Sequence, residues 1–230
     1  MTNSAQQNIE GLLVVNKGPL RSSFSLVSGL RKKLNVKKIG HAGTLDPFAT
    51  GVMILLIGRN YTRLSDRFLK DDKEYRALLK LGEKTDTFDI DGMVTFTSNY
   101  VPTKADIQHV IDQFQGEIEQ IPPMFSAKKV KGKKLYELAR QGKEIERKPC
   151  KIHVKTKLIR YQYPFLEIHV LCSKGTYIRS LGHDIGELLG TGAHLASLER
   201  TRSGQFTLEN ALASHYIFSN DFNIEPYILK

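Results

Sequence analysis

The sequence predicts a protein of mixed helices and strands, of the α+β or α/β class, built around a central sheet. Three observations lead to this prediction. Short apolar or β-branched runs recur along the chain, segments with helical spacing lie between them, and 40% of the 230 residues are hydrophobic. The length allows one large domain, or a main domain with a smaller appendage, and no internal repeat divides the chain.

Strands are expected wherever short apolar or β-branched runs occur. These runs cover residues 11–15, 51–58, 74–82, 151–159 and 165–172. Apolar residues at helical spacing predict helices at about 23–34, 103–114, 134–141 and 178–188. Ser23 is the expected N-cap of the first helix, the T-x-x-D pattern at Thr103 is that of the second, and Gly142 is expected to end the third.

The net charge of +10 is concentrated in one segment of the chain. Residues 128–160 contain 13 Lys and Arg against three acidic residues, so the rest of the chain is neutral. Concentrated positive charge attracts polyanions, among which nucleic acid is the usual partner, although a solvated lysine-rich surface is the alternative interpretation. Because residues 129–148 contain few large apolar side chains, they are expected to project from the main body and to close over an RNA.

Composition argues against several classes of protein. The longest strongly apolar run, residues 52–57, is too short to cross a bilayer, and the N-terminus has no signal peptide pattern, so a cytoplasmic location is expected. Cys150 and Cys172 lack the companions of a zinc site or a disulfide framework and are expected to be free thiols. Neither a nucleotide-binding fingerprint nor a metal-spaced cluster occurs, so no cofactor and no metal are expected, and a monomer is the default.

The stretch GHAGTLDPFATG, residues 40–51, is the candidate catalytic segment. Its glycines permit backbone angles that other residues resist, and Pro47 restrains Asp46 toward an extended conformation that presents the carboxylate. From these residues alone, an ordinary Asp-Pro turn is the alternative interpretation. A hydrolase that uses His41 and Asp46 is a further possibility, weakened because no third orienting group is evident.

Three more side chains could act with Asp46. Tyr75 shares a strand face with apolar residues, so it is either a core tyrosine or a stacking platform at the edge of a pocket. The segment CSKGTYIRS, residues 172–180, runs from a strand into a helix and places Tyr177 and Arg179 in or near the first turn. Arginine is unfavourable to the helix dipole there, so Arg179 is either a tolerated exposed residue or a guanidinium aimed at a carboxylate.

Five segments together resemble the bacterial tRNA pseudouridine-55 synthase family of the TruB type. They are residues 40–51, 73–92, 120–142, 172–195 and 200–206, and they follow one another in unbroken order. The resemblance implies the pseudouridine synthase fold, which is an α+β fold with a central mixed, mainly antiparallel sheet flanked by helices. It also implies a basic thumb-like insertion at about 124–152. A single catalytic domain over residues 1–230 is expected, without the C-terminal PUA domain of many relatives and with weaker or more salt-sensitive tRNA binding.

The resemblance further implies an activity, the isomerisation of uridine 55 in the T-loop of tRNA to pseudouridine by base flipping, without a cofactor or a protein partner. Asp46 matches the essential aspartate of the family, which acts as the nucleophile. Tyr75 matches the tyrosine that stacks on the target base, and Arg179 matches the arginine that pairs with the aspartate. A tRNA-binding or tRNA-folding protein without chemistry is the alternative function. The sequence leaves open whether Asp46 attacks the ribose or the uracil.

Contacts with RNA are expected for a wider set of residues. His41 matches a histidine that helps to fill the space left by the flipped nucleotide, and Tyr177 and Leu198 match residues that line the pocket. The remaining expected contacts are basic: Lys17, Lys128, Lys129, Lys131, Lys133, Arg200 and Arg202. The chain departs from the family pattern at Asn16, which replaces an acidic residue, at Gly18 and Pro19, which are exchanged, and at Glu199. Glu199 replaces an arginine and is expected to weaken one phosphate contact.

Overall fold

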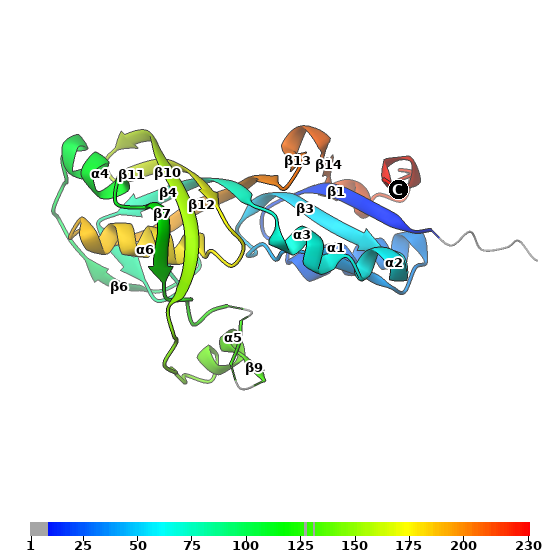
Figure 1. Ribbon diagram of the computed structural model, residues 1–230, viewed down its shortest axis with the longest axis horizontal. Coiled ribbons are helices and arrows are strands. Elements are labelled where there is room, and N and C mark those ends of the chain that lie inside the picture. The colour runs from blue at the N-terminus through cyan, green and yellow to red at the C-terminus, as the bar shows by residue number, and fades with distance from the viewer. Residues whose placement is uncertain (1–8, 127, 131) are drawn as a thin grey trace, which may run out of the picture. The chain divides into compact units, whose positions relative to one another are not determined.

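The computed structural model describes residues 9–126, 128–130 and 132–230, and the chain divides into two compact units (Figure 1). The first unit contains the chain up to Lys73 together with Glu199–Lys230, and the second contains Glu74–Leu198. Strands β4 (Lys73–Leu81) and β12 (Ala193–Ser203) each have residues in both units. The chain therefore enters and leaves the second unit along a strand.

The first unit is built on a mixed sheet with the strand order β14-β1-β3-β12. β1 (Gly11–Lys17) pairs antiparallel with β3 (Thr50–Ile57), which pairs in parallel with β12 through Glu199 and Arg200. Short strands extend this sheet: β2 (Ile39–Ala42) along β3, β13 (Phe206–Thr207) along β12, and β14 (Leu212–Ala213) along β1. Its helices are α1 (Ser23–Leu34), α2 (Gly58–Thr62), α3 (Ser65–Lys70), η1 (Leu208–Asn210), η2 (Ser214–Ile217) and η3 (Glu225–Tyr227).

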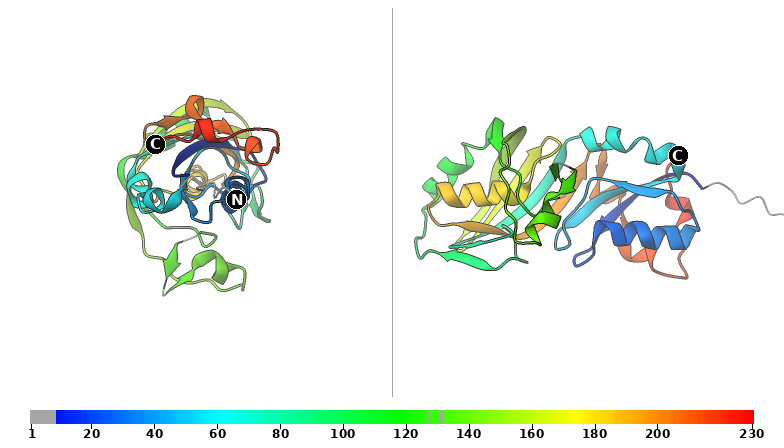
Figure 2. Two further views of the ribbon diagram at one scale, coloured as in Figure 1. Left: turned by 90° about the vertical axis from the view of Figure 1, so that its right-hand side faces the viewer. Right: turned by 90° about the horizontal axis from the view of Figure 1, so that it is seen from below.

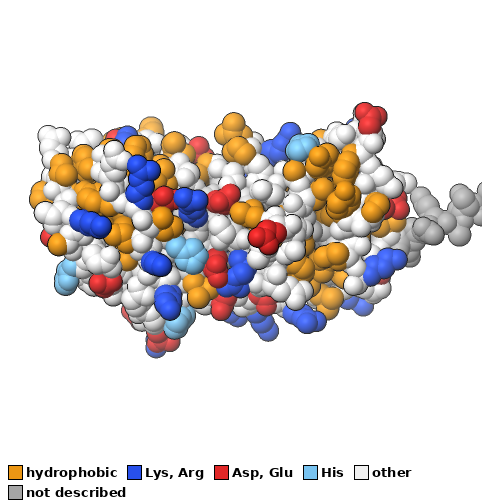
Figure 3. Space-filling view, turned by 90° about the horizontal axis from the view of Figure 1, so that it is seen from above, with side chains coloured by type: hydrophobic (Ala, Val, Ile, Leu, Met, Phe, Trp, Pro, Cys, Tyr) orange, Lys and Arg blue, Asp and Glu red, His pale blue; other side chains and the backbone are white. Residues whose placement is uncertain are grey.

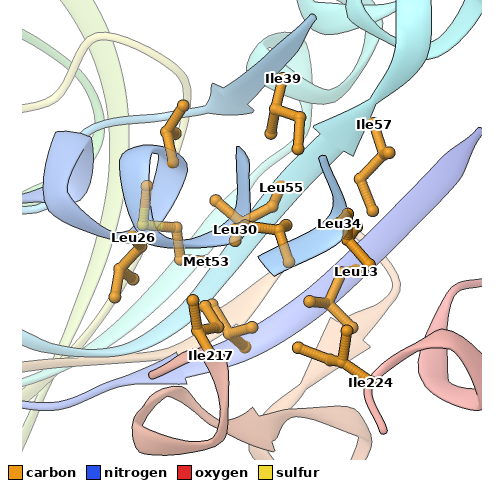
Figure 4. Close-up of a cluster of buried hydrophobic side chains, with 12 residues drawn as sticks. Leu13, Leu26, Leu30, Leu34, Ile39, Met53, Leu55, Ile57, Ile217 and Ile224 are labelled. Carbon is orange, nitrogen blue, oxygen red and sulfur yellow. The ribbon is translucent and has the colours of Figure 1, made fainter. Parts of the chain in front are cut away.

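Both faces of β3 are buried, which explains why its sequence is a continuous apolar run without alternation. Met53, Leu55 and Ile57 point into one hydrophobic cluster, which is completed by α1, β1 and the C-terminal segment (Figure 4). Val52, Ile54 and Leu56 point into a second cluster on the other face. The strand that follows the candidate catalytic stretch is therefore held in the core on both sides.

The cap of α1 differs from the sequence prediction. Ser22 is the N-cap, and its side chain accepts a hydrogen bond from the backbone N–H of Ser25. Ser23 is the first helical residue and is buried, so its hydroxyl is available for a tertiary contact. The prediction of Ser23 as the cap was wrong. Ser22 and Ser23 have the same capping propensity, so the sequence does not show which of them is the last residue before the helix.

The second unit has the strand order β12-β4-β11-β10-β7. β7 (Gln115–Gln120), β10 (Cys150–Gln162) and β11 (Phe165–Cys172) are antiparallel neighbours. The remaining elements are the hairpin of β5 (Glu83–Thr85) and β6 (Val94–Thr97) and the helices α4 (Lys104–Ile111) and α6 (Ile178–Leu188). A Cβ on Gly182 of α6 would lie 2.6 Å from Leu79 Cδ2, and a Cβ on Gly186 would lie 2.3 Å from the Ala193 nitrogen. Helix α6 therefore packs closely on β4 and β12.

The basic segment between β7 and β10 forms a small substructure of its own. It contains β8 (Lys129–Val130), β9 (Lys133–Lys134) and α5 (Leu135–Ala139), and it extends away from β7 and β10 in Figures 1 and 2. Gly142 has φ +68° and donates its backbone N–H to the Ala139 carbonyl, so it ends this helix as predicted.

The predicted fold class is confirmed, because helices flank mixed, mainly antiparallel strands in both units. The long predicted strands and all four predicted helices are present, and the capping box at Thr103 is formed. Strands β2, β7 and β12 were not predicted, since their residues alternate too weakly or are too polar to be recognised. Among the described residues, no helix has the length and apolar character needed to span a membrane.

Replacement of Gly51 by alanine should break the contact between β3 and β12. Gly51 has φ +106°, and an added Cβ would lie 2.2 Å from the backbone oxygen of Arg200. We expect Gly51→Ala to lower the free energy of unfolding by about 3 kcal/mol or more. Gly190→Ala is the control, because Gly190 also has a positive φ but nothing lies within 4 Å, so only the backbone strain of about 1–2 kcal/mol applies. Equal losses in urea titrations of the two variants would contradict this prediction.

Candidate functional site

The loop that carries Asp46 connects β2 to β3 and is held by a buried lysine. The side chain of Lys17, at the end of β1, is inaccessible to solvent. Its ammonium donates hydrogen bonds to the carbonyls of Pro47 at 3.0 Å and Ala49 at 2.6 Å, and to its neighbour Gly18 at 3.0 Å. Lys17 therefore fixes the backbone directly after Asp46.

A buried arginine holds the two ends of the same loop. Arg200, on β12, is 1% exposed, and its Nε donates to the Val52 carbonyl at 2.6 Å. Its Nη2 donates to the Gly43 carbonyl at 3.2 Å, so one guanidinium connects the start of the loop to the third residue of β3. With such partners, Arg200 is suited to positioning the loop, as is Lys17, and direct RNA contacts of these two residues stay a prediction.

A third hydrogen-bonded contact precedes Asp46. The hydroxyl of Ser23, at the start of α1, donates to the Leu45 carbonyl and accepts from the Leu45 N–H, both at 2.9 Å. This pair of bonds joins α1 to the residue next to Asp46. The carboxylate is thus presented, half-buried, from a loop whose backbone is bound on both sides.

The surroundings of Asp46 are electropositive. Burial lowers the pKa of Lys17 to about 8, the charge of Asp46 opposes this shift, and the charge of Arg200 adds to it. Burial and the same arginine lower the pKa of His41, so its imidazole is neutral at pH 7. The Nδ1 atom of His41 is buried and has no hydrogen-bond partner among the described residues.

In the second unit, Arg179 is buried and held by several polar partners. It lies at the second position of α6 and is 5% exposed. Nη1 donates to the Thr87 carbonyl at 3.1 Å, Nη2 donates to the Phe125 carbonyl at 2.6 Å, and Nη1 lies 3.4 Å from a carboxylate oxygen of Asp89. Burial of the guanidinium is tolerated because carbonyls and a carboxylate replace water as its partners.

Asp89 is a site residue that the sequence did not reveal. It lies in the loop TDTFDIDG, residues 85–92, where the hydroxyl of Thr87 and the N–H of Asp91 both donate to its carboxylate. Three aspartates occur in this loop, and no spacing rule distinguishes the buried one. Within the described part of the chain, no group of three or more His, Cys, Asp or Glu residues could hold a metal ion.

Tyr75, Tyr177 and Leu198 also belong to the second unit. Tyr75 on β4 and Leu198 on β12 are almost fully buried, at 8% and 6% exposure. The backbone N–H and carbonyl of Tyr177 are both bound by the side-chain amide of Gln120, which fixes the start of α6. The contacts of Tyr177 with Gln120 position the first turn of α6, and so they position the backbone of Arg179.

The predicted basic contacts differ in their surroundings. Lys128 donates to the Cys150 thiol at 2.8 Å, Lys133 is exposed, and Arg202 donates to the Gly204 carbonyl at 2.8 Å. Lys129 lies on β8, and Lys131 lies outside the described residues. Neither Cys150 nor Cys172 forms a disulfide, in agreement with the prediction.

The structure therefore arranges the predicted residues in two groups. Lys17, His41, Asp46 and Arg200 come together in the first unit, whereas Tyr75, Tyr177, Arg179 and Leu198 belong to the second. Within each group, backbone carbonyls and buried charges set the position of the functional side chain. The pairing of Asp46 with Arg179 involves both units and stays a prediction.

Comparison with protein families identifies two matching models. The model of the TruB family pseudouridylate synthase N-terminal domain matches residues 31–178, and the model of the tRNA pseudouridylate synthase B C-terminal domain matches residues 179–220. The first match alone covers more than half of the chain. Its bounds include Asp46, Tyr75, Tyr177 and the basic segment.

Several bacterial proteins are similar over most of their length. The chain is 61% identical over 205 residues to tRNA pseudouridine synthase B of Protochlamydia amoebophila (strain UWE25). This match covers 89% of this chain and 78% of the relative. It is 53% identical over 224 residues to the protein of the same name from Chlamydia trachomatis serovar L2, which covers 97% and 93%.

Among solved structures, a chain from a Cbf5-Nop10-Gar1 complex is similar with a TM-score of 0.71 and 29% identity. The similarity covers 94% of this chain and 58% of that one. A chain from an H/ACA RNP bound to a substrate RNA containing 2'-deoxyuridine matches with a TM-score of 0.66 and 30% identity, over 89% and 51%. This chain therefore spans between half and three fifths of the length of these solved chains.

The lowered pKa of Lys17 predicts a specific pH dependence of stability. The folded-state pKa of Lys17 is about 8, which lies below the unfolded value of 10.5. Between these two pH values the unfolded state binds more protons than the folded state does. The free energy of unfolding therefore rises as the pH increases from 8 to 10.5. The unfolding free energy of the wild type minus that of Lys17→Met should rise by about 3 kcal/mol in total from pH 8 to pH 10.5. Lys32→Met, at an exposed position on α1, is the matched control variant.

Proposed function

Because this chain belongs to the TruB family of pseudouridylate synthases, we propose that it converts a uridine of tRNA to pseudouridine, with Asp46 as the nucleophile. The observation that carries the proposal is the Asp46 loop, in which buried Lys17 and Arg200 present one carboxylate within a family-matched segment. Curated relatives that carry the name tRNA pseudouridine synthase B support tRNA as the substrate.

The reaction is an isomerisation. The bond between N1 of uracil and C1′ of the ribose breaks, the base turns, and a bond from C5 to C1′ forms. The proton of C5 is lost and N1 gains one, so atoms and electrons balance without an oxidant or a reductant. Attack by an ionised carboxylate divides this change into two easier steps, as in other forms of covalent catalysis.

The electropositive surroundings of Asp46 suit this role. A carboxylate must be charged to act as a nucleophile, and nearby cations favour the charged form. The charges of Lys17 and Asp46 interact, as the pKa of Lys17 records. His41, which is neutral at pH 7 and has a buried nitrogen without a partner among the described residues, is suited to contacts with an uncharged group such as a base or a ribose hydroxyl.

Base flipping assigns roles to Tyr75 and Arg179. A uridine must leave its stack before its glycosidic bond can be reached, at a cost on the order of a few kcal/mol. Stacking on an aromatic side chain, worth roughly 1–3 kcal/mol per base, offsets this cost, and Tyr75 is the residue proposed to provide it. Arg179 is proposed to orient the carboxylate of Asp46, supported by the rigidity that Asp89, Thr87 and Phe125 give to its guanidinium.

The finer parts of the proposal concern the substrate and its surroundings. We propose uridine 55 of the T-loop as the target, with the T-stem and T-loop bound by the basic thumb-like insertion at about 124–152. The extension of β8, β9 and α5 away from β7 and β10 supports a clasping role for this segment. A monomer acting in the cytoplasm completes the proposal.

Asp46→Asn should abolish pseudouridine formation while tRNA binding stays within about twofold of the wild type. The amide cannot act as a nucleophile, and losses of at least about 1,000-fold are typical when such a group is removed. Tritium release from tRNA labelled at uridine C5 measures the reaction, and filter binding measures affinity. Asp112→Asn, at the exposed C-cap of α4, is the control. A wild type that binds tRNA but releases no tritium would favour an RNA-binding protein without chemistry.

Arg179→Lys should lower kcat by about tenfold or more and change KM much less. Lysine keeps the charge but cannot hold Asp89 and two carbonyls in the planar geometry of a guanidinium, so the orientation of the charge is lost. Single-turnover rates at saturating tRNA test this, with Arg67→Lys on the exposed surface of α3 as the control. An unchanged kcat would show that Arg179 has no part in the chemistry.

A further inference from the structure

We propose that Leu20 and Phe24 form a contact surface for an unstacked nucleobase of the substrate RNA, next to the target uridine. The two residues lie at the entry to α1 in the first unit. This inference rests on the proposed function, and it adds a binding surface to the Asp46 loop. It depends on exposure, backbone conformation, charge and a hydrogen-bonded connection to that loop.

Leu20 and Phe24 are unusually exposed for large apolar side chains. Their exposed fractions are 86% and 63%, the highest of any large hydrophobic residue among the described residues of the first unit. Single exposed apolar residues are common and need no explanation. Leu20 precedes the N-cap of α1 and Phe24 is the second residue of this helix, so two strongly exposed apolar side chains lie four positions apart at the start of one element.

The backbone at Leu20 has a conformation that is unfavourable for leucine. Three non-glycine residues have a positive φ among the described residues: Leu20 at +60°, Asn35 and Phe88. Asparagine tolerates this conformation, and the ring of Phe88 stacks on His183 at 4.0 Å. Leu20 instead directs its side chain into solvent. Strain of this kind persists mainly where a binding or catalytic site uses it.

Arginine side chains border this surface. The guanidinium carbon of Arg31 lies 5.9 Å from the centre of the Phe24 ring, and its Nη2 donates to the Ile39 carbonyl, which fixes the cation. Arg21, between the two apolar residues, is exposed and lies over the ring of Phe218. Residues 31–38 carry five positive side chains. By contrast, the face shown in Figure 3 mixes basic and acidic side chains.

An aromatic ring among fixed cations is the pattern that recognises single-stranded nucleic acid. Bases stack on the ring irrespective of sequence, and arginines attract the neighbouring phosphates. A purely apolar partner would take water from these charges without supplying an anion, so RNA fits the surface better than the apolar face of another protein does.

The surface is connected to the catalytic loop. Ser23, between Leu20 and Phe24, makes the two 2.9 Å hydrogen bonds with Leu45, and Leu45 precedes Asp46. The apolar pair and the proposed nucleophile therefore belong to one hydrogen-bonded assembly within the first unit. A nucleotide beside the target uridine is the part of the RNA that such an assembly would reach.

The test uses two variants in the full chain, each compared with the wild type by filter binding of tRNA and by steady-state tritium release. Phe24→Ala should raise the Kd and the KM for tRNA by about 5- to 150-fold, corresponding to the loss of one stacked base, with kcat at saturation changed by less than about threefold. Phe24→Tyr should restore binding, because it retains an aromatic ring. Leu20→Gly should weaken binding without lowering Tm, because glycine relieves the strain.

Phe165→Ala is the matched control, since Phe165 is an exposed phenylalanine (44%) of the second unit. It should leave Kd and KM unchanged. Unchanged Kd and KM in both Phe24→Ala and Leu20→Gly, with Tm preserved, would overturn the inference. The binding assay does not need turnover, so a wild type that forms no pseudouridine would refute the proposed function while the Kd values still test this surface.

Discussion

The candidate site depends on the burial of two positive charges against main-chain carbonyls. The side chains of Lys17 and Arg200 are almost completely buried from solvent. Each donates hydrogen bonds to backbone carbonyls around Asp46. Removing these charges from water is costly, and the cost is tolerated only because oxygen atoms replace the lost water. The loop itself is short, residues 43–49, and has no regular secondary structure. The cations therefore supply the rigidity that the loop sequence lacks.

The second unit also holds a buried cation by backbone carbonyls, but here one partner is a carboxylate. Arg179 is buried among two carbonyls and the carboxylate of Asp89, and Asp89 is itself bound by Thr87 and Asp91. Close packing of α6, through Gly182 and Gly186, fixes the helix from which the guanidinium extends. In both units, the functional charge is held by groups that cannot change rotamer, since most of the partners are backbone atoms. Such preorganisation is the condition for electrostatic catalysis.

The sequence predicted the elements whose hydrophobic pattern is strong and missed those whose pattern is weak. The apolar run of β3 and the helical spacing of α1 and α6 were sufficient, whereas the polar β7 and the mixed residues of β12 were not. Asp46 was proposed through family resemblance combined with an unusual loop composition. Lys17 and Arg200 were predicted as RNA contacts alongside the family resemblance, and only the tertiary structure shows that both side chains are buried. Asp89 was missed because its selection among three aspartates depends on contacts distant in sequence.

The separation of Arg200 from its partners has a consequence for synthesis of the chain. Arg200 follows Val52 by 148 positions and Gly43 by 157. At rates of about 5–20 residues per second, the ribosome produces β3 roughly 7–30 seconds before Arg200 exists. During that interval one edge of β3 lacks its parallel neighbour, and the carbonyls of Gly43 and Val52 lack their donor. The nascent protein must therefore keep an unfinished sheet edge from pairing with other chains until its last segment emerges.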